Sequence, residues 1–310
     1  MPQSGQDHDA LVLPDVYIIG TQKSGTTSLY DWIAQHPRVY GNPSAKDVPF
    51  FAMDDVYSKG LQHLVNLFRF APPDSLVLGG EVSAIFFPFA IERLHAVIPN
   101  AKLIVAIRNP VDRAYSAWQF AVERGLEDRT FEQSVADEIL GITYETNIVN
   151  LAYKDYLARG KYAEQLECLS KHFPAEQVHV IFFEELRADP EKVMNGVWKY
   201  FGVDNFKPEF DVKNVTQGGA RFKWIQRLLY IPRNRTDIFA RFVRALLPYG
   251  ARFIVRSFLE QINRVPNAKR NAMTPEIRQT LVEYFMEDMG RLPSLIGVDA
   301  EKLTKLGWGK

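Results

Sequence analysis

Residues 20–28 combine two glycines, a lysine and several hydroxyl side chains in a stretch that could bind an anion. The apolar residues 16–19 before it predict a strand, and apolar residues at helical spacing follow it. Gly20 and Gly25 allow a tight turn in which backbone N–H groups converge, and the positive end of the following helix attracts negative charge. The stretch is therefore predicted to hold a phosphate or a chemically similar group.

The position of the lysine separates two classes of enzyme. A Walker A loop has the pattern GxxxxGK[ST], in which the lysine directly follows the second glycine. Here Thr26 occupies that position and Lys23 lies inside the loop. One interpretation is a kinase or NTPase that uses ATP or GTP, and another is an enzyme with a different phosphorylated donor. An ordinary strand-to-helix turn is the structural alternative.

A second candidate anion site follows a later apolar run. Residues 103–107 predict a buried strand that ends at Arg108, and Pro110 begins a helix that carries Ser116 two turns further on. An arginine fork and a serine hydroxyl can together bind a phosphate, although a single arginine at a strand end is more often a surface ion-pair partner. The strand lacks the terminal Asp with which a Walker B motif binds magnesium.

Two acidic residues are candidates for a general base. Asp47 lies between Lys46 and a pair of phenylalanines, a segment that in isolation indicates a surface turn with aromatic side chains in the core. Glu81 follows the strand predicted at residues 76–79. In a parallel sheet the ends of these strands meet at one edge, where open α/β sheets bind their ligands.

Composition indicates a globular protein with a substantial core. The chain has 310 residues, 46% of them hydrophobic, and a formal net charge of zero, so no overall field favours nucleic acid. The single Cys168 excludes an internal disulfide, and no Cys/His cluster suggests a metal site. The N-terminus is acidic and polar, and no apolar run is long enough to span a bilayer, so a cytoplasmic location is expected.

The alternation of short apolar runs with amphipathic ones predicts an α/β fold, with a central parallel sheet flanked by helices. Strands are expected at 16–19, 76–79, 103–107 and 178–183, and helices at 26–35, 89–97, 111–124, 151–172 and from 190 to 202. We expect a flexible N-terminus at 1–14 and one domain at 15–310. Within that domain, residues 15–210 would form the nucleotide-binding core and residues 211–310 a helical, basic lobe that contributes to the acceptor site.

Residues 221–264 carry ten basic side chains against Asp237 and Glu260. This segment is either a set of solvated helices or a surface that contacts anions or a membrane. The basic residues are Arg221, Lys223, Arg227, Arg233, Arg235, Arg241, Arg244, Arg252, Arg256 and Arg264.

Three segments together resemble the sulfotransferase superfamily, which uses 3′-phosphoadenosine 5′-phosphosulfate (PAPS). YIIGTQKSGTTSLYDWIAQHP is similar to the family's 5′-phosphosulfate loop, IVAIRNPVDRAYSAW to its 3′-phosphate segment, and KDVPFF to an acidic-aromatic segment of the glycan-modifying and related bacterial branch. GKYAEQL at 160–166 and FEEL at 183–186 also resemble that branch, so the resemblance covers about residues 17–203. It implies a P-loop-like three-layer fold.

The resemblance implies a role for each matching residue. Lys23 would contact the sulfuryl-bearing end of PAPS and stabilise the leaving phosphate, and Asp47 would be the base, with Glu81 as its rival. Arg221 corresponds loosely to a basic residue of a later loop over the nucleotide. The donor-binding residues would be Gln22, Lys23, Ser24, Gly25, Thr26, Thr27 and Ser28 for the 5′-phosphosulfate, and Arg108 and Ser116 for the 3′-phosphate.

The chain departs from that branch at three positions. Asp47 replaces the usual Glu, Pro49 stands where His is common, and Val82 replaces the lysine typical of heparan-type members, which argues against heparan sulfate as acceptor. The expected acceptor is a hydroxyl or amine of a carbohydrate, a lipid-linked group or a small molecule, with no metal and no nucleic acid. The alternatives are a P-loop kinase or NTPase, and a non-enzymatic scaffold that docks on anionic lipid or glycan.

Overall fold

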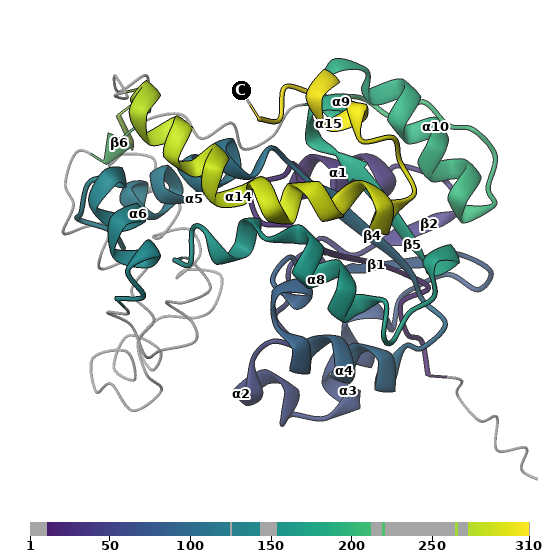
Figure 1. Cartoon of the computed structure of the whole chain (residues 1–310). Coiled ribbons are helices and arrows are strands. Elements are labelled where there is room, and N and C mark those ends of the chain that lie inside the picture. Colours follow the sequence, from purple (N-terminus) through teal and green to yellow (C-terminus); the bar gives the residue numbers. More distant parts are fainter. Residues whose placement is uncertain are drawn as a thin grey trace, which may run out of the picture. The chain divides into compact units, whose positions relative to one another are not determined.

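The computed structural model describes residues 11–124, 126–142, 154–211, 219–220, 264–265 and 272–309 (Figure 1). The described residues form two compact units. The first unit lies within residues 1–107, 163–211 and 295–297, and the second within 108–162, 212–294 and 298–310. The basic segment 221–263 and most of the N-terminus predicted to be flexible lie outside the described residues. The predicted domain boundaries stay a prediction.

The first unit is built on a five-stranded parallel sheet with strand order β2-β3-β1-β4-β5. This arrangement confirms the predicted α/β fold, and it adds a short strand, β2, that the sequence did not predict. All five residues of β1 are buried, as expected for a parallel sheet covered on both faces. The strands are β1 (Val16–Gly20), β2 (Val39–Gly41), β3 (Leu76–Gly80), β4 (Lys102–Ile107) and β5 (Val178–Phe182).

One face of this sheet packs against α1 (Thr26–Ile33), α9 (Phe183–Ala188) and α10 (Pro190–Phe201). On the opposite side lie α3 (Leu61–Phe68) and α4 (Pro88–Val97) (Figure 1). The unit also contains α2 (Asp54–Tyr57), most of α8 (Tyr162–Leu169) and three short 3₁₀ helices at Pro43–Ala45, Ala84–Phe86 and Ala175–Gln177. The two layers of helices cover both faces of a sheet whose strands alternate their side chains between them.

Helix α10 shows how local signals set the ends of an element. Asp189 precedes the helix and its carboxylate accepts the Lys192 N–H at 3.0 Å, while Pro190 takes the first helical position. Gly202 ends the helix in the left-handed conformation, with φ of 76°. These features are the N-cap, the first-turn proline and the terminal glycine expected from the sequence.

The second unit is helical in the residues that are described. Its apolar cluster joins α5 (Pro110–Glu123), α6 (Phe131–Ile139) and α14 (Pro275–Ile296), with Tyr156 and Leu157 between them. The unit also contains a 3₁₀ helix at Ala158–Gly160, the helix α15 (Glu301–Lys305), and a two-stranded pair formed by β6 (Gly219–Ala220) and β7 (Arg264–Val265).

The prediction of one continuous helix at 151–172 is wrong. In the described part, residues 154–157 are irregular, a 3₁₀ turn covers Ala158–Gly160, and α8 begins only at Tyr162. Asp155 takes a positive φ of 57°, which an α-helix excludes. The carboxylate of Glu138 accepts the N–H groups of Leu157 and Ala158 at 2.8 and 2.9 Å, so these donors bond to a side chain in place of a helical carbonyl.

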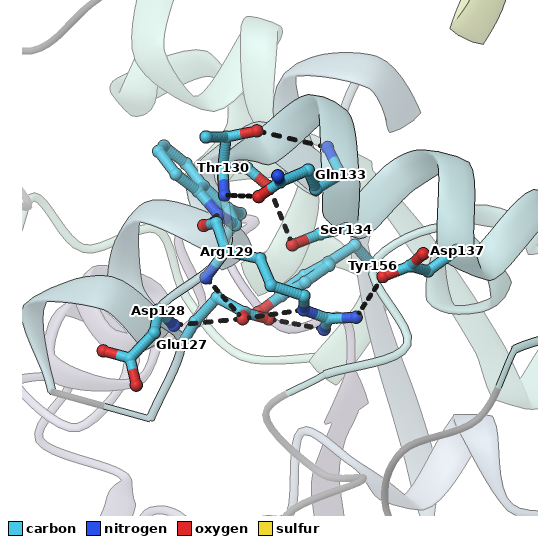
Figure 2. A network of polar contacts seen from close by, with 9 residues as sticks. Glu127, Asp128, Arg129, Thr130, Gln133, Ser134, Asp137 and Tyr156 are labelled. Atoms are coloured by element: carbon cyan, nitrogen blue, oxygen red, sulfur yellow. Dashed lines mark hydrogen bonds and ion pairs between the residues drawn. The ribbon is translucent and has the colours of Figure 1, made fainter.

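A buried polar network in the second unit fixes the segment before α6. Figure 2 shows the Arg129 guanidinium between two carboxylates, with bonds of 3.0 and 2.8 Å to Glu127 and of 2.8 Å to Asp137. The Tyr156 hydroxyl donates to Glu127 at 3.1 Å. Burial raises the pKa of Glu127, but the hydrogen bonds and charge of Arg129 outweigh it, so the pKa lies below its ordinary value.

We expect Arg129→Ala to lower the free energy of unfolding by about 2–4 kcal/mol at pH 7, because it leaves the buried Glu127 carboxylate without its cation. A depressed pKa stabilises the fold above the unfolded pKa, and this stabilisation is lost as the pH falls through the folded value. The difference between variant and wild type should therefore shrink below about pH 4. Urea denaturation across pH 3–8 measures it.

Lys305→Ala is the matched control, since Lys305 and Glu301 form an exposed pair at 3.0 Å. Its cost should stay below about 1 kcal/mol. An Arg129 variant as stable as this control at pH 7 would contradict the role assigned to the network.

Candidate active site

The loop between β1 and α1 has the backbone of an anion-binding turn. Lys23 and Gly25 have positive φ values of 70° and 81°, and Gly25 directly precedes α1 without a side-chain cap. The first-turn N–H groups of a helix have no partner within it, and Gly25 at the N-cap has no side chain with which to accept them. Alternation of ordinary and left-handed residues forms a concave arrangement of N–H groups that suits an anion.

Hydrogen bonds of its own buried hydroxyl groups fix the loop to β4 and to itself. The Thr21 N–H and hydroxyl both donate to the Ala106 carbonyl of β4, at 2.7 and 2.8 Å. The Ser24 hydroxyl is fully buried and hydrogen-bonded to the Thr21 hydroxyl at 2.7 Å. The side chain of Ser24 therefore supports the loop, whereas Gln22, Lys23 and Thr27 keep partial exposure.

Gly25 is required by both conformation and space. Its φ of 81° is rarely adopted by residues with a side chain, and an added Cβ would lie 3.0 Å from the Phe183 ring. Thr26 and Ser28, in the first turn of α1, are buried at 9% and 8% exposure. The loop thus offers backbone N–H donors to an anion, with Lys23 as the charged side chain within it.

Asp47 and Glu81 lie in neighbouring segments of the same unit. Glu81 directly follows β3, and its N–H donates to the Ile18 carbonyl of β1 at 2.8 Å. Its side chain is completely buried, and its two oxygens accept the N–H groups of Phe51 and Ala52 at 2.8 Å each. Asp47 is exposed, and its Oδ1 accepts the Val82 N–H at 3.1 Å. The structure therefore brings together the two acids that the sequence singled out.

The two acids have raised pKa values. Burial raises the pKa of Glu81 to about 8, against the lowering effect of its two N–H bonds and of Arg93, and Asp47 adds to the rise. The pKa of Asp47 is also raised, because the surrounding protein removes part of its hydration, while the Val82 N–H and Lys46 lower it. A raised pKa makes a carboxylate a stronger proton acceptor only while it stays ionised, and a carboxyl group with a pKa of about 8, such as Glu81, is largely protonated at pH 7.

Arg108 and Ser116 belong to the second unit. Arg108 directly follows β4, and the Asn109 side chain caps α5 by accepting the N–H groups of Val111 and Asp112 at 3.0 and 3.4 Å. Ser116 lies on α5 with partial exposure. The predicted helix start at Pro110 is thus confirmed. Arg221 lies outside the described residues, and the role proposed for it stays a prediction.

Sequence reasoning missed Tyr162, which supports Arg108, and the buried Arg113 on α5. The Tyr162 hydroxyl donates to the Arg108 carbonyl at 2.8 Å, and the fully buried Arg113 donates to the Tyr156 carbonyl. Burial lowers the pKa of Arg113, which Tyr162 and Glu138 partly offset. One signal was present in the sequence, since Arg113 shares the helical face of Ala114, Ala117 and Ala121 and a charge on an apolar face indicates a buried partner.

Within the described ranges, no group of three or more His, Cys, Asp or Glu side chains could hold a metal ion. Over the same ranges, no helix has both the length and the apolar composition that crossing a membrane requires.

Comparison with known proteins identifies the family. The family model described as "Sulfotransferase domain" matches residues 13–235. The bifunctional heparan sulfate N-deacetylase/N-sulfotransferase 1 of Caenorhabditis briggsae is 30% identical over 210 residues, which are 65% of this chain and 24% of that protein. The human bifunctional heparan sulfate N-deacetylase/N-sulfotransferase 3 is 33% identical over 198 residues, 62% of this chain and 22% of that protein. The chain thus spans about a quarter of the length of these relatives.

A solved structure agrees over nearly the whole chain. The sulfotransferase from Alicyclobacillus acidocaldarius has a TM-score of 0.67 and 25% identity, covering 96% of this chain and 99% of that one. These matches favour a sulfotransferase over both the kinase and the non-enzymatic alternatives. With a family model that covers well over half of its length and a fold shared with a bacterial member, the chain belongs to the sulfotransferase family.

Proposed function

We propose that the protein transfers the sulfuryl group of PAPS to a hydroxyl or amine of a carbohydrate acceptor. The observation that carries this proposal is the loop at 20–28, in which left-handed Lys23 and Gly25 lead into the uncapped start of α1. Its backbone donors suit a phosphosulfate, and the position of Lys23 differs from that of a Walker lysine. The heparan sulfate N-sulfotransferase relatives support a carbohydrate acceptor.

In the transfer, an acceptor oxygen or nitrogen forms a bond to sulfur while the bond from sulfur to the bridging phosphate oxygen breaks. The leaving product is 3′-phosphoadenosine 5′-phosphate (PAP), and the acceptor proton passes to a carboxylate, Asp47 or Glu81. Lys23 and the N–H groups of the loop stabilise the negative charge that develops on the leaving phosphate. Arg108 and Ser116 hold the 3′-phosphate, which distinguishes PAPS from ATP.

Other parts of the proposal concern residues that, except for Arg264, lie outside the described ranges. Arg221 would add a cation to the donor site, and the basic residues of 221–264 would contact an anionic acceptor or a membrane surface. Lipid-linked and small-molecule acceptors belong in the same acceptor panel as carbohydrates. A cytoplasmic location stays a prediction.

Arg108→Ala should weaken the binding of PAP by about 10- to 100-fold, because a charge-assisted hydrogen bond to phosphate contributes about 1.5–3 kcal/mol. Isothermal titration calorimetry with PAP, in the presence of EDTA, measures the affinity without any acceptor. Arg187→Ala, at an exposed arginine of α9, serves as the control and should bind like the wild type. Wild-type protein that fails to bind PAP, or an Arg108 variant that binds it normally, would exclude the proposed donor site.

Lys23→Ala should lower turnover by about 10²- to 10³-fold, as expected for the loss of one preorganised donor to a developing charge. Transfer of ³⁵S from labelled PAPS to N-deacetylated and to N-acetylated heparan sulfate measures turnover and separates amine from hydroxyl acceptors. Extracts of the source cells extend the panel to other acceptors.

Lys59→Ala is the control for this measurement, since Lys59 is an exposed lysine remote in sequence from the loop. It should transfer at the wild-type rate. If Lys23→Ala also retained that rate, Lys23 would have no part in the chemical step.

A further inference from the structure

The segment at residues 47–52, here called the acid loop, is bound at both ends to the end of β3 and the residues that follow it. At its start, the Val48 N–H donates to the Gly80 carbonyl at 3.2 Å, and Asp47 accepts the Val82 N–H at 3.1 Å. At its end, Glu81 accepts the N–H groups of Phe51 and Ala52. The two segments therefore exchange carboxylate bonds in both directions.

The approach of the two segments is close. An added Cβ on Gly80 would lie 2.7 Å from the Lys46 carbonyl oxygen, so only glycine fits without displacing the acid loop. Phe51 is fully buried and packs edge-on against Tyr17 of β1, with ring centres 5.7 Å apart. The position of the acid loop is thus defined by backbone contacts and by the core.

Arg93 of α4 holds the same loop from another side. Its Nη1 donates to the Phe51 carbonyl at 3.0 Å, and its Nη2 pairs with Asp54 at 2.6 Å. Phe51 is consequently fixed on both sides, its N–H by Glu81 and its carbonyl by Arg93. A buried carboxylate, a cation and two backbone donors form one connected arrangement, and such arrangements rigidify the segments that they join.

The two acids differ in their exposure and in how many of their oxygens already accept hydrogen bonds. Both oxygens of Glu81 accept backbone N–H groups, and the side chain has no exposed surface. Asp47 is exposed, and among the described residues only its Oδ1 accepts a hydrogen bond. A general base must reach the proton that it removes, which Asp47 can do at the surface and Glu81 cannot.

We propose that Glu81 is a positioning residue, whose carboxylate fixes the acid loop and thereby holds Asp47 as the base that takes the acceptor proton. This inference rests on the proposed sulfuryl transfer. It assigns different roles to two acids that sequence reasoning left as rivals. Misplacement of a catalytic group by about 1 Å can cost about 10²-fold in rate, so a supporting carboxylate can matter as much as a contact to substrate.

The first test needs no acceptor. In ¹⁵N-resolved NMR spectra of the full chain, the amides of Phe51 and Ala52 report on Glu81, and the Val82 amide reports on Asp47. Glu81→Gln replaces one acceptor oxygen with an NH₂ group that cannot accept, so one N–H bond of the acid loop is lost. The Val82 amide shifts with any substitution at the adjacent Glu81, so the informative quantity is the titration midpoint of Asp47, read at Val82, which we expect to change.

A Glu81→Gln spectrum in which Phe51 or Ala52 shifts while the Asp47 titration stays as in wild type would overturn the proposal. In that case Glu81 would fix the end of the acid loop without affecting Asp47. The groups that face Glu81 and contribute to its titration are Asp47, Arg93 and Tyr17, so the same spectra are recorded for Asp47→Asn as a reference.

The second test is a double-mutant cycle on ³⁵S transfer from PAPS. Glu81→Gln should lower kcat by about 10- to 100-fold with an unchanged Kd for PAP, because the donor loop is intact. In the Asp47→Asn background the same change should cost no more than about 3-fold, because a positioning residue acts only through the group that it positions.

Two results of the cycle would contradict the proposal. The first is an equal loss from Glu81→Gln with and without Asp47. The second is an Asp47→Asn variant that keeps the wild-type rate while Glu81→Gln abolishes transfer, which would make Glu81 the base.

Arg93→Gln is a variant with a lower risk of misfolding than Glu81→Gln, because the Arg93 side chain is 24% exposed whereas Glu81 is completely buried. It frees the Phe51 carbonyl and should lower kcat in the same direction, again with unchanged PAP affinity and again only when Asp47 is present. Glu92→Gln, at the exposed neighbouring position on α4, is the control and should leave both quantities unchanged. An Arg93 variant with the wild-type kcat would contradict the proposed coupling.

Failure of the proposed function is distinguishable from failure of this inference. Wild-type protein that transfers no sulfate from PAPS to any acceptor would remove the reaction, while the NMR comparison would still show whether Glu81 positions Asp47.

Discussion

Parallel hydrogen bonding of β1 to β3 on one side and to β4 on the other is the constraint on which the candidate site depends. In a parallel sheet all strands end at the same edge, so the segments that follow β1 and β3 must lie beside each other. The loop at 20–28 and the residues after Gly80 are thereby neighbours, although about sixty positions separate them in the chain.

Buried polar groups then define the finer geometry. A carboxylate or hydroxyl removed from water must be satisfied by hydrogen bonds, and each such group therefore fixes the segment that supplies its partner. Thr21 and Ser24 support the anion loop from within, Glu81 fixes the acid loop, and Glu127 with Arg129 fixes the start of α6. These side chains hold backbone in place, and the exposed side chains around them are left for ligands.

Elements set by local interactions were predicted correctly, whereas an element set by contacts distant in the chain was not. Helix α10 could be predicted from the sequence, because everything that sets its ends lies within a few residues of them. These determinants are the Asp189 cap, the first-turn proline and Gly202. The helix expected at 151–172 was not, because Glu138, nearly twenty positions earlier in sequence, takes the N–H groups of Leu157 and Ala158. Helical periodicity does not reveal a competing acceptor that is distant in the chain.

The sequence by itself determined the α/β class, the anion loop with its displaced Lys23, and the pair of acids at 47 and 81. These properties depend on residue type, local spacing and strand order, all of which are written in the chain. Only the tertiary structure decided that the two acids are unequal. Glu81 is buried and its oxygens are taken by the N–H groups of Phe51 and Ala52, whereas Asp47 stays at the surface. Burial and bonding between distant segments, rather than residue type, decide which of two carboxylates stays accessible.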